Sequence, residues 1–263
     1  MLFRRDGDAV IAIAQPSHSW LSGQLVRAWG NEAFAVPTPH EEVRLGAEQH
    51  DIGWLDWEAA PTLNPSTGLP HEFREVGTRA HTELWTRGVR LALAFGRYPA
   101  LLVSLHAKTI YDAFFDFDRA SHEDASTARK FLAEQHEFRR TVIETLASDP
   151  RYAAAATPEA IERNRRLVGA TDHMSLEIGW GVTEEARVPD VPSTGTGRIE
   201  LRIRSPRRDP TDLVLDPWPF SADRVEVLCE GRRLHGAFAD ETAMRQTLDA
   251  AERVVIAAVL RPR

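Results

Sequence analysis

Cysteine is nearly missing from this chain of 263 residues: Cys229 is the single one, so no disulfide can form within the chain. Proteins without disulfides are typical of reducing compartments, and we expect a cytoplasmic location. Long apolar runs are scarce as well, because stretches such as residues 98–105 are far shorter than a membrane-spanning helix. The opening segment, MLFRRDGDAV, becomes charged after three positions, unlike a secretory signal. These absences argue against a secreted or membrane-embedded protein.

An excess of positive charge is also missing. The formal net charge is −7 and the pI is near 5.8, whereas proteins that bind nucleic acids or anionic membranes carry basic surfaces. We therefore expect neither partner. The hydrophobic fraction of 43% and the charged fraction of 27% are those of an ordinary globular protein, and they do not indicate a particular function. The sequence leaves the oligomeric state open.

Helical periodicity is what the middle of the chain has in abundance. Apolar residues recur at spacings of three and four from Ser17 to about Trp180. Helices are predicted over residues 17–29, 41–57, 73–95, 99–117, 124–148 and 158–178. A hairpin pattern precedes them over residues 1–14, and strand-like runs follow at residues 198–203, 212–215, 224–229 and 253–260, with a helix at 241–251.

Short strands need a sheet to bury them, so we expect the N-terminal hairpin to join the C-terminal strands. The predicted fold is mainly α, and α+β overall. A helical bundle would occupy residues 15–180, and a small β-rich subdomain would be formed by residues 1–14 together with residues 185–263.

Several potential metal ligands lie on the apolar stripes of the predicted helices. His18, for example, shares a helix face with Leu25 and Trp29, at spacings of seven and eleven. A buried imidazole or carboxylate without a partner costs several kcal/mol, roughly, so something must satisfy each of them. One or two divalent ions such as iron, manganese or zinc would do so; a purely structural polar network is the alternative. The candidate metal ligands are His18, His50, Asp51, His81, His106 and Asp172.

The order of these ligands resembles that of the HD-domain superfamily, with a histidine, a His-Asp doublet, later histidines and a closing aspartate. The resemblance covers roughly residues 15–180 and implies a helical fold, one or two divalent metals and phosphohydrolase or phosphodiesterase activity. In this sequence His18 is similar to the first ligand, His50 and Asp51 to the doublet, and Asp172 to the last. The segments QPSH at 15–18, HDIGW at 50–54, NPSTGLP at 64–70 and SLH at 104–106 more narrowly resemble an uncharacterised bacterial domain-of-unknown-function family, DUF family 3891, over the entire chain.

The leading functional prediction is a metal-dependent hydrolase acting on a phosphate ester or related small molecule. Asp51 and His81 are the predicted catalytic residues, and Arg165, seven residues before Asp172 on the same stripe, is a candidate substrate contact. Two alternatives remain open. One is a di-iron oxygenase of HD-like fold, and the other is a non-enzymatic ligand-sensing or assembly module with a structural His/Asp cluster.

Overall fold

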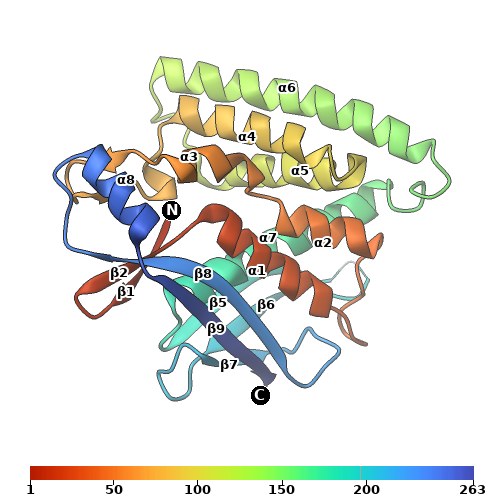
Figure 1. Ribbon diagram of the computed structural model, residues 1–263. Helices are drawn as coiled ribbons and strands as arrows, with labels where there is room; N and C mark the ends of the chain where they lie inside the picture. The colour runs from red at the N-terminus through yellow and green to blue at the C-terminus, as the bar shows by residue number, and fades with distance from the viewer. Residues whose placement is uncertain (196) are drawn as a thin grey trace.

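The computed structural model describes residues 1–195 and 197–263, and it combines a layered set of helices with one large sheet (Figure 1). The sheet has the strand order β1-β2-β8-β9-β7-β6-β5. Neighbouring strands are antiparallel except β7 and β9, which run parallel. Its strands are β1 (Leu2–Asp6), β2 (Ala9–Ile13), β5 (Glu185–Pro192), β6 (Arg198–Arg204), β7 (Asp212–Asp216), β8 (Val225–His235) and β9 (Arg253–Pro262).

The predicted mainly α fold is wrong. The protein is α+β, with 48% helix, 22% strand and a curled sheet of seven strands. The expected union of the hairpin with the C-terminal strands is confirmed, since β2 pairs with β8 from Ala9↔His235 to Ile13↔Gly231. Strand β5 was missed because Pro189 gives its sequence the pattern of a turn. In the structure the pairing of β5 with β6 shifts register between Val188 and Val191, which accommodates this proline.

The helices are stacked on the sheet (Figure 1). Helices α1 and α7 lie nearest the sheet, α2, α4 and α5 pack beyond them, and α6 lies outermost. A short hairpin, β3 (Leu63–Asn64) with β4 (Leu69–Pro70), follows α3. No helix in the described part of the chain is long and apolar enough to cross a membrane. The helices are α1 (Gln15–Ala28), α2 (His40–Glu48), α3 (Leu55–Ala59), α4 (Thr78–Ala92), α5 (Arg97–Phe114), α6 (His122–Ala147), α7 (Pro158–Trp180) and α8 (Glu241–Ala250), with 3₁₀ turns η1 (Ile52–Trp54) and η2 (Phe73–Glu75).

One hydrophobic core joins the sheet to the helices. Ile13 of β2, Leu25 of α1, Met174 of α7 and Leu201 of β6 belong to the same cluster of buried side chains. The sheet is therefore a full layer of the fold and not a small appendage, because its inner face supplies part of the apolar surface that covers α1 and α7. The predicted domain boundaries at 15–180 and at 1–14 with 185–263 stay a prediction.

Polar side chains of α1 bind the edge of β8 beyond the point where β2 ends. Gln24 accepts the Leu228 N–H through Oε1 at 3.1 Å and donates from Nε2 to the Leu228 carbonyl at 2.8 Å. Ser17 Oγ lies 3.2 Å and 2.7 Å from the backbone N and O of Glu230. These bonds satisfy backbone groups that a strand edge would otherwise expose.

Candidate metal centre

The His-Asp doublet lies in a break between two helical segments. A single helix was predicted over residues 41–57, but α2 ends at Glu48 and the 3₁₀ turn η1 begins at Ile52. Asp51 has φ −108° and ψ 19°, outside the α-helical region. Because the helix is interrupted, His50 and Asp51 are released from the ~100° divergence of adjacent helical residues. Both side chains can therefore turn towards the same point.

Glycine at position 53 allows the link between α2 and α3, residues 49–54, to lie directly against α4. A Cβ added to Gly53 would stand 2.1 Å from the carbonyl oxygen of Leu84 and 2.9 Å from the backbone nitrogen of Gly88. Any side chain at this position would push the link away from α4. The sequence HDIG therefore contains two candidate ligands and the glycine that permits their placement.

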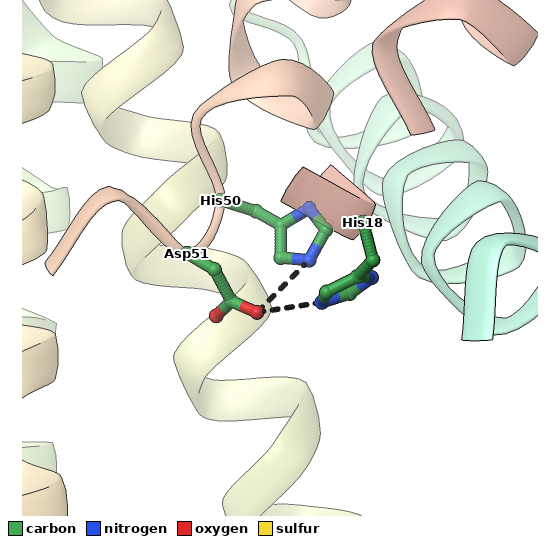
Figure 2. A group of neighbouring side chains, drawn as sticks. All are labelled: His18, His50 and Asp51. Carbon is green, nitrogen blue, oxygen red and sulfur yellow. Dashed lines mark hydrogen bonds and ion pairs between the residues drawn. The ribbon is translucent and has the colours of Figure 1, made fainter. Parts of the chain in front are cut away.

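One carboxylate oxygen of Asp51 faces the imidazole rings of both His18 and His50 (Figure 2). His18 Nε2 lies 2.9 Å from Asp51 Oδ2, and His50 Nε2 lies 3.5 Å from the same atom. Gln15 Nε2 donates to this oxygen at 3.2 Å. All four residues are buried. The predicted convergence of His18 with His50 and Asp51 is thus present in the structure.

Asp172 of α7 closes the cluster from the other side. Its Oδ1 lies 3.3 Å from His50 Nε2 and 3.8 Å from His18 Nδ1, and its Oδ2 lies 3.5 Å from His106 Nε2 on α5. Two sets of three residues have ligand atoms within 4.8 Å of one another, which is close enough to surround a cation. The sets are His18, His50 and Asp51, and His50, His106 and Asp172.

Hydrogen bonds on the outer nitrogens determine which imidazole atoms face the centre. His50 Nδ1 donates to the Ala47 carbonyl at 2.7 Å. His18 Nδ1 lies 2.8 Å from Ser175 Oγ, whose own hydroxyl donates to the Asp172 carbonyl at 2.7 Å, so His18 Nδ1 is the donor in that pair. Nδ1 of each ring therefore carries a proton, and Nε2 is the inward atom that can hold a second proton or a cation. Such outer partners are typical of metal-ligating histidines.

The charges inside the cluster require a positive counterpart. Burial alone would lower the pKa of His50, but Asp51 and Asp172 outweigh it and raise the pKa to about 10. Burial would raise the pKa of both carboxyl groups, yet His50 and its neighbours hold the pKa of Asp51 well below its usual range and lower that of Asp172. The two carboxylates bring two negative charges into the protein interior. Two protons or one divalent cation would balance them.

Among the described residues, His50 Nε2 is buried and makes no hydrogen bond, although carboxylate oxygens lie 3.3 Å and 3.5 Å away. Because the Nδ1 proton is committed to the Ala47 carbonyl, a second proton or a cation must occupy Nε2 between the two carboxylates. The donor set of imidazole nitrogens and carboxylate oxygens therefore fits a divalent metal ion. Because both three-residue sets share His50, the geometry suits one ion better than two.

A family model described as "Protein of unknown function (DUF3891)" matches residues 1–236. The chain belongs to this family. The narrower resemblance drawn from the sequence is thereby confirmed, whereas membership of the HD-domain superfamily stays a prediction. Searches of the curated proteins and of the solved structures give no match. The DUF3891 match includes the cluster of His18, His50, Asp51, His106 and Asp172 and extends from β1 to the end of β8, so the family spans helices and sheet alike.

His106 differs from the other two imidazoles of this DUF3891 chain. Its Nδ1 is buried and has no hydrogen-bond partner in the described residues. Burial and the neighbouring His50 lower its pKa to about 4, so the ring is neutral near pH 7. Without an outer acceptor that holds the proton on Nδ1, the ring is less prepared to present an Nε2 lone pair. We therefore rank it below His18 and His50 as a ligand.

His81 belongs to neither three-residue set. Its Nε2 accepts a hydrogen bond from the Trp85 indole at 3.1 Å, and its Nδ1 lies 3.1 Å from Tyr111 Oη. Both ring nitrogens are therefore engaged, and burial lowers the pKa of His81 to about 4. The ring is a neutral member of an aromatic group beside the cluster. Its catalytic assignment stays a prediction that this arrangement does not favour.

The guanidinium of Arg165 is also engaged. Nε and Nη2 donate to the Glu162 carboxylate at 2.7 Å and 2.8 Å, and Nη1 donates to Thr109 Oγ1 at 2.7 Å. A substrate phosphate would have to replace these partners, so Arg165 is not a free anion site in this conformation. Its role as a substrate contact stays a prediction.

Sequence reasoning missed the residues that hold the ligands. Gln15 and Ser175 each lie three positions from a ligand on the same helix, and Ala47 lies three before His50. That spacing places them on a shared face, so a search for polar residues one turn from each candidate ligand would have found the first two. Ala47 acts through its backbone carbonyl, for which the sequence has no signal.

Proposed function

We propose that the protein is a metal-dependent hydrolase with a single divalent ion held by His18, His50, Asp51 and Asp172. The observation that supports this most directly is the inward Nε2 of His50, whose ring proton is committed to the Ala47 carbonyl. His18 has the same arrangement through Ser175. A phosphate ester or related small molecule is the substrate class that the His, His-Asp, Asp order implies.

The carboxylates form the more accessible edge of the centre. The side chains of Asp172 and Asp51 retain 11% and 6% exposure, against 1% for His18 and 0% for His50. Water and substrate would therefore approach over the two aspartates while the imidazoles form the base of the site. When bound, a divalent ion lowers the pKa of an attacking water and polarises the scissile group. Asp51 and Asp172 would orient that water by accepting its hydrogens.

Metal content is the first test, measured on protein purified without chelator. We expect about one equivalent of a divalent ion, and hydrolysis of phosphomonoester or phosphodiester probes after loading with manganese, zinc, iron or cobalt. Asp51→Asn should abolish both loading and turnover. Asp112→Asn is the matched control, because Asp112 is exposed and pairs with Lys108 on α5. Full metal content in the Asp51 variant would refute the proposed centre.

The two alternatives predict different results. An oxygen-activating di-iron centre needs two ions, and the sharing of His50 by both ligand sets gives it less support. It would be revealed by two iron equivalents and by turnover that requires oxygen. A structural polar cluster would leave the protein free of metal, with a melting temperature that does not respond to chelator or added ion.

A further inference from the structure

Gln15 contacts the proposed centre through a donor that does not depend on protonation. It is the first residue of α1, is buried, and lies three residues before His18. Its Nε2 donates to Asp51 Oδ2, the oxygen that also faces the Nε2 atoms of His18 and His50. An amide N–H is a donor at every pH, whereas an imidazole nitrogen donates only while it carries a proton.

We propose that Gln15 is a positioning residue, which orients the Asp51 carboxylate once a metal ion is bound; this inference rests on the proposed metal centre. Imidazole nitrogens that ligate an ion no longer donate to Asp51 Oδ2. Of the three close nitrogen neighbours of that oxygen in the described residues, Gln15 Nε2 then remains as the donor. Without it the carboxylate is free to rotate about its own side chain, and ligation weakens.

Glu58 fixes the position of Gln15 in turn. The backbone N–H of Gln15 donates to Glu58 Oε1 at 3.0 Å. The capping residue of α1 is Ala14, which offers no side-chain acceptor, so the carboxylate of Glu58 on α3 takes the place of an N-cap. A negative charge also suits the positive end of a helix dipole.

Asp51 and Glu58 are seven residues apart, so one short segment contacts Gln15 at two points. The main chain of Gln15 is held by Glu58, and its side chain reaches back to Asp51. Both contacts are buried. This double attachment ties the start of α1, and with it His18, to the link that carries the other ligands. Gln15, whose main chain is held by Glu58, can therefore hold Asp51 Oδ2 in a defined position.

The test compares two Gln→Met variants of the same helix. Gln15→Met keeps the length of the side chain and removes the donor to Asp51. Gln24→Met, the matched control, removes the bonds from α1 to Leu228 on β8. Affinity for Zn²⁺ is measured by competition with a chromophoric chelator, and ligand geometry by the visible absorption of bound Co²⁺. We expect Gln15→Met to weaken binding by about 10–100-fold and to change the Co²⁺ spectrum. Gln24→Met should leave both as in the wild type.

The outcomes separate this inference from the proposed function. Wild-type affinity and an unchanged Co²⁺ spectrum in Gln15→Met would overturn the positioning role and leave the metal centre intact. A wild-type protein that takes up neither ion would overturn both. If Gln15→Met does not fold, Gln15→Leu removes the same donor with a shorter apolar side chain; it should bind the ion as weakly as expected for Gln15→Met, and undiminished affinity would again overturn the role.

Discussion

Metal binding should release a proton from His50. The metal-free ring carries an extra proton at neutral pH, because Asp51 and Asp172 raise its pKa to about 10 against the effect of burial. Nδ1 remains committed to the Ala47 carbonyl, so the proton that must leave is the one on Nε2. A metal ion therefore competes with a proton for the same atom.

The size of this competition follows from the pKa. A pH of 7.5 is about 2.5 units below the pKa of His50, so removing the Nε2 proton costs about 3 kcal/mol. Metal binding is therefore ~300-fold weaker than it would be to a ring that is already deprotonated. With one proton released, the dissociation constant should fall about tenfold for each unit rise in pH. Between pH 6.5 and pH 8.5 the expected change is therefore ~100-fold.

Isothermal titration in buffers of different ionisation enthalpy measures the protons released, and chelator competition across the pH range measures the affinity. Ordinary surface histidines, with a pKa of about 6.5, would give an affinity that levels off above about pH 7. A plateau there would refute the assignment of His50 as a ligand that exchanges a proton for the ion. His50→Gln should lose the steep pH dependence together with tight binding.

Four further predictions follow from the same geometry. Metal at about 100 times its dissociation constant stabilises the protein by about 2.7 kcal/mol, so chelation should lower the melting temperature by about 5–10 °C in calorimetry. His106→Ala should retain metal with reduced affinity, whereas His50→Ala should lose it, as metal analysis of both variants would show. Gly53→Ala should lower metal affinity, because the new Cβ meets the Leu84 carbonyl at 2.1 Å and displaces the link; an unchanged dissociation constant would contradict this. Burial lowers the folded pKa of His81 to about 4, below its unfolded value of about 6.5. Protonation of His81 therefore opposes folding. As the pH falls from 6.5 to 4, this residue should lower the free energy of unfolding by about 3 kcal/mol. Urea titrations should show a smaller loss of stability over this pH range for His81→Gln than for the wild type.

The buried positions of the candidate ligands were predictable because the apolar stripes are strong periodic signals. His18, His106 and Asp172 each lie on a helix that the periodicity located to within a few residues, and each faces the interior as the stripe requires. His81 satisfies the same pattern, yet it is engaged by Trp85 and Tyr111. Periodicity indicates that a side chain is buried, but it does not indicate which neighbouring residue forms hydrogen bonds with it.

The fold was harder to predict for a related reason. The strand runs were located individually, but their assembly depends on pairing between residues far apart in the chain, such as Ile13 with Gly231. Nothing local indicates that such pairs form one sheet of seven strands. The bulged strand β5 was missed because Pro189 and Asp190, with φ 59°, have the composition of a turn. Tertiary pairing therefore decided what local propensity left open.

The position of the centre explains why the sheet matters to a site made of helical residues. His18 and Asp172 lie on α1 and α7, the two helices nearest the sheet, whereas His50, Asp51 and His106 belong to segments beyond them. β2 ends at Ile13 and α1 begins at Gln15, so the end of the strand determines where the helix that carries His18 begins. Side chains from two layers of helices therefore meet around one point. This packing gives a physical reason for a DUF3891 match that extends through β8, because a chain truncated after α7 would keep every residue of the cluster and lose most of the layer that packs against α1 and α7.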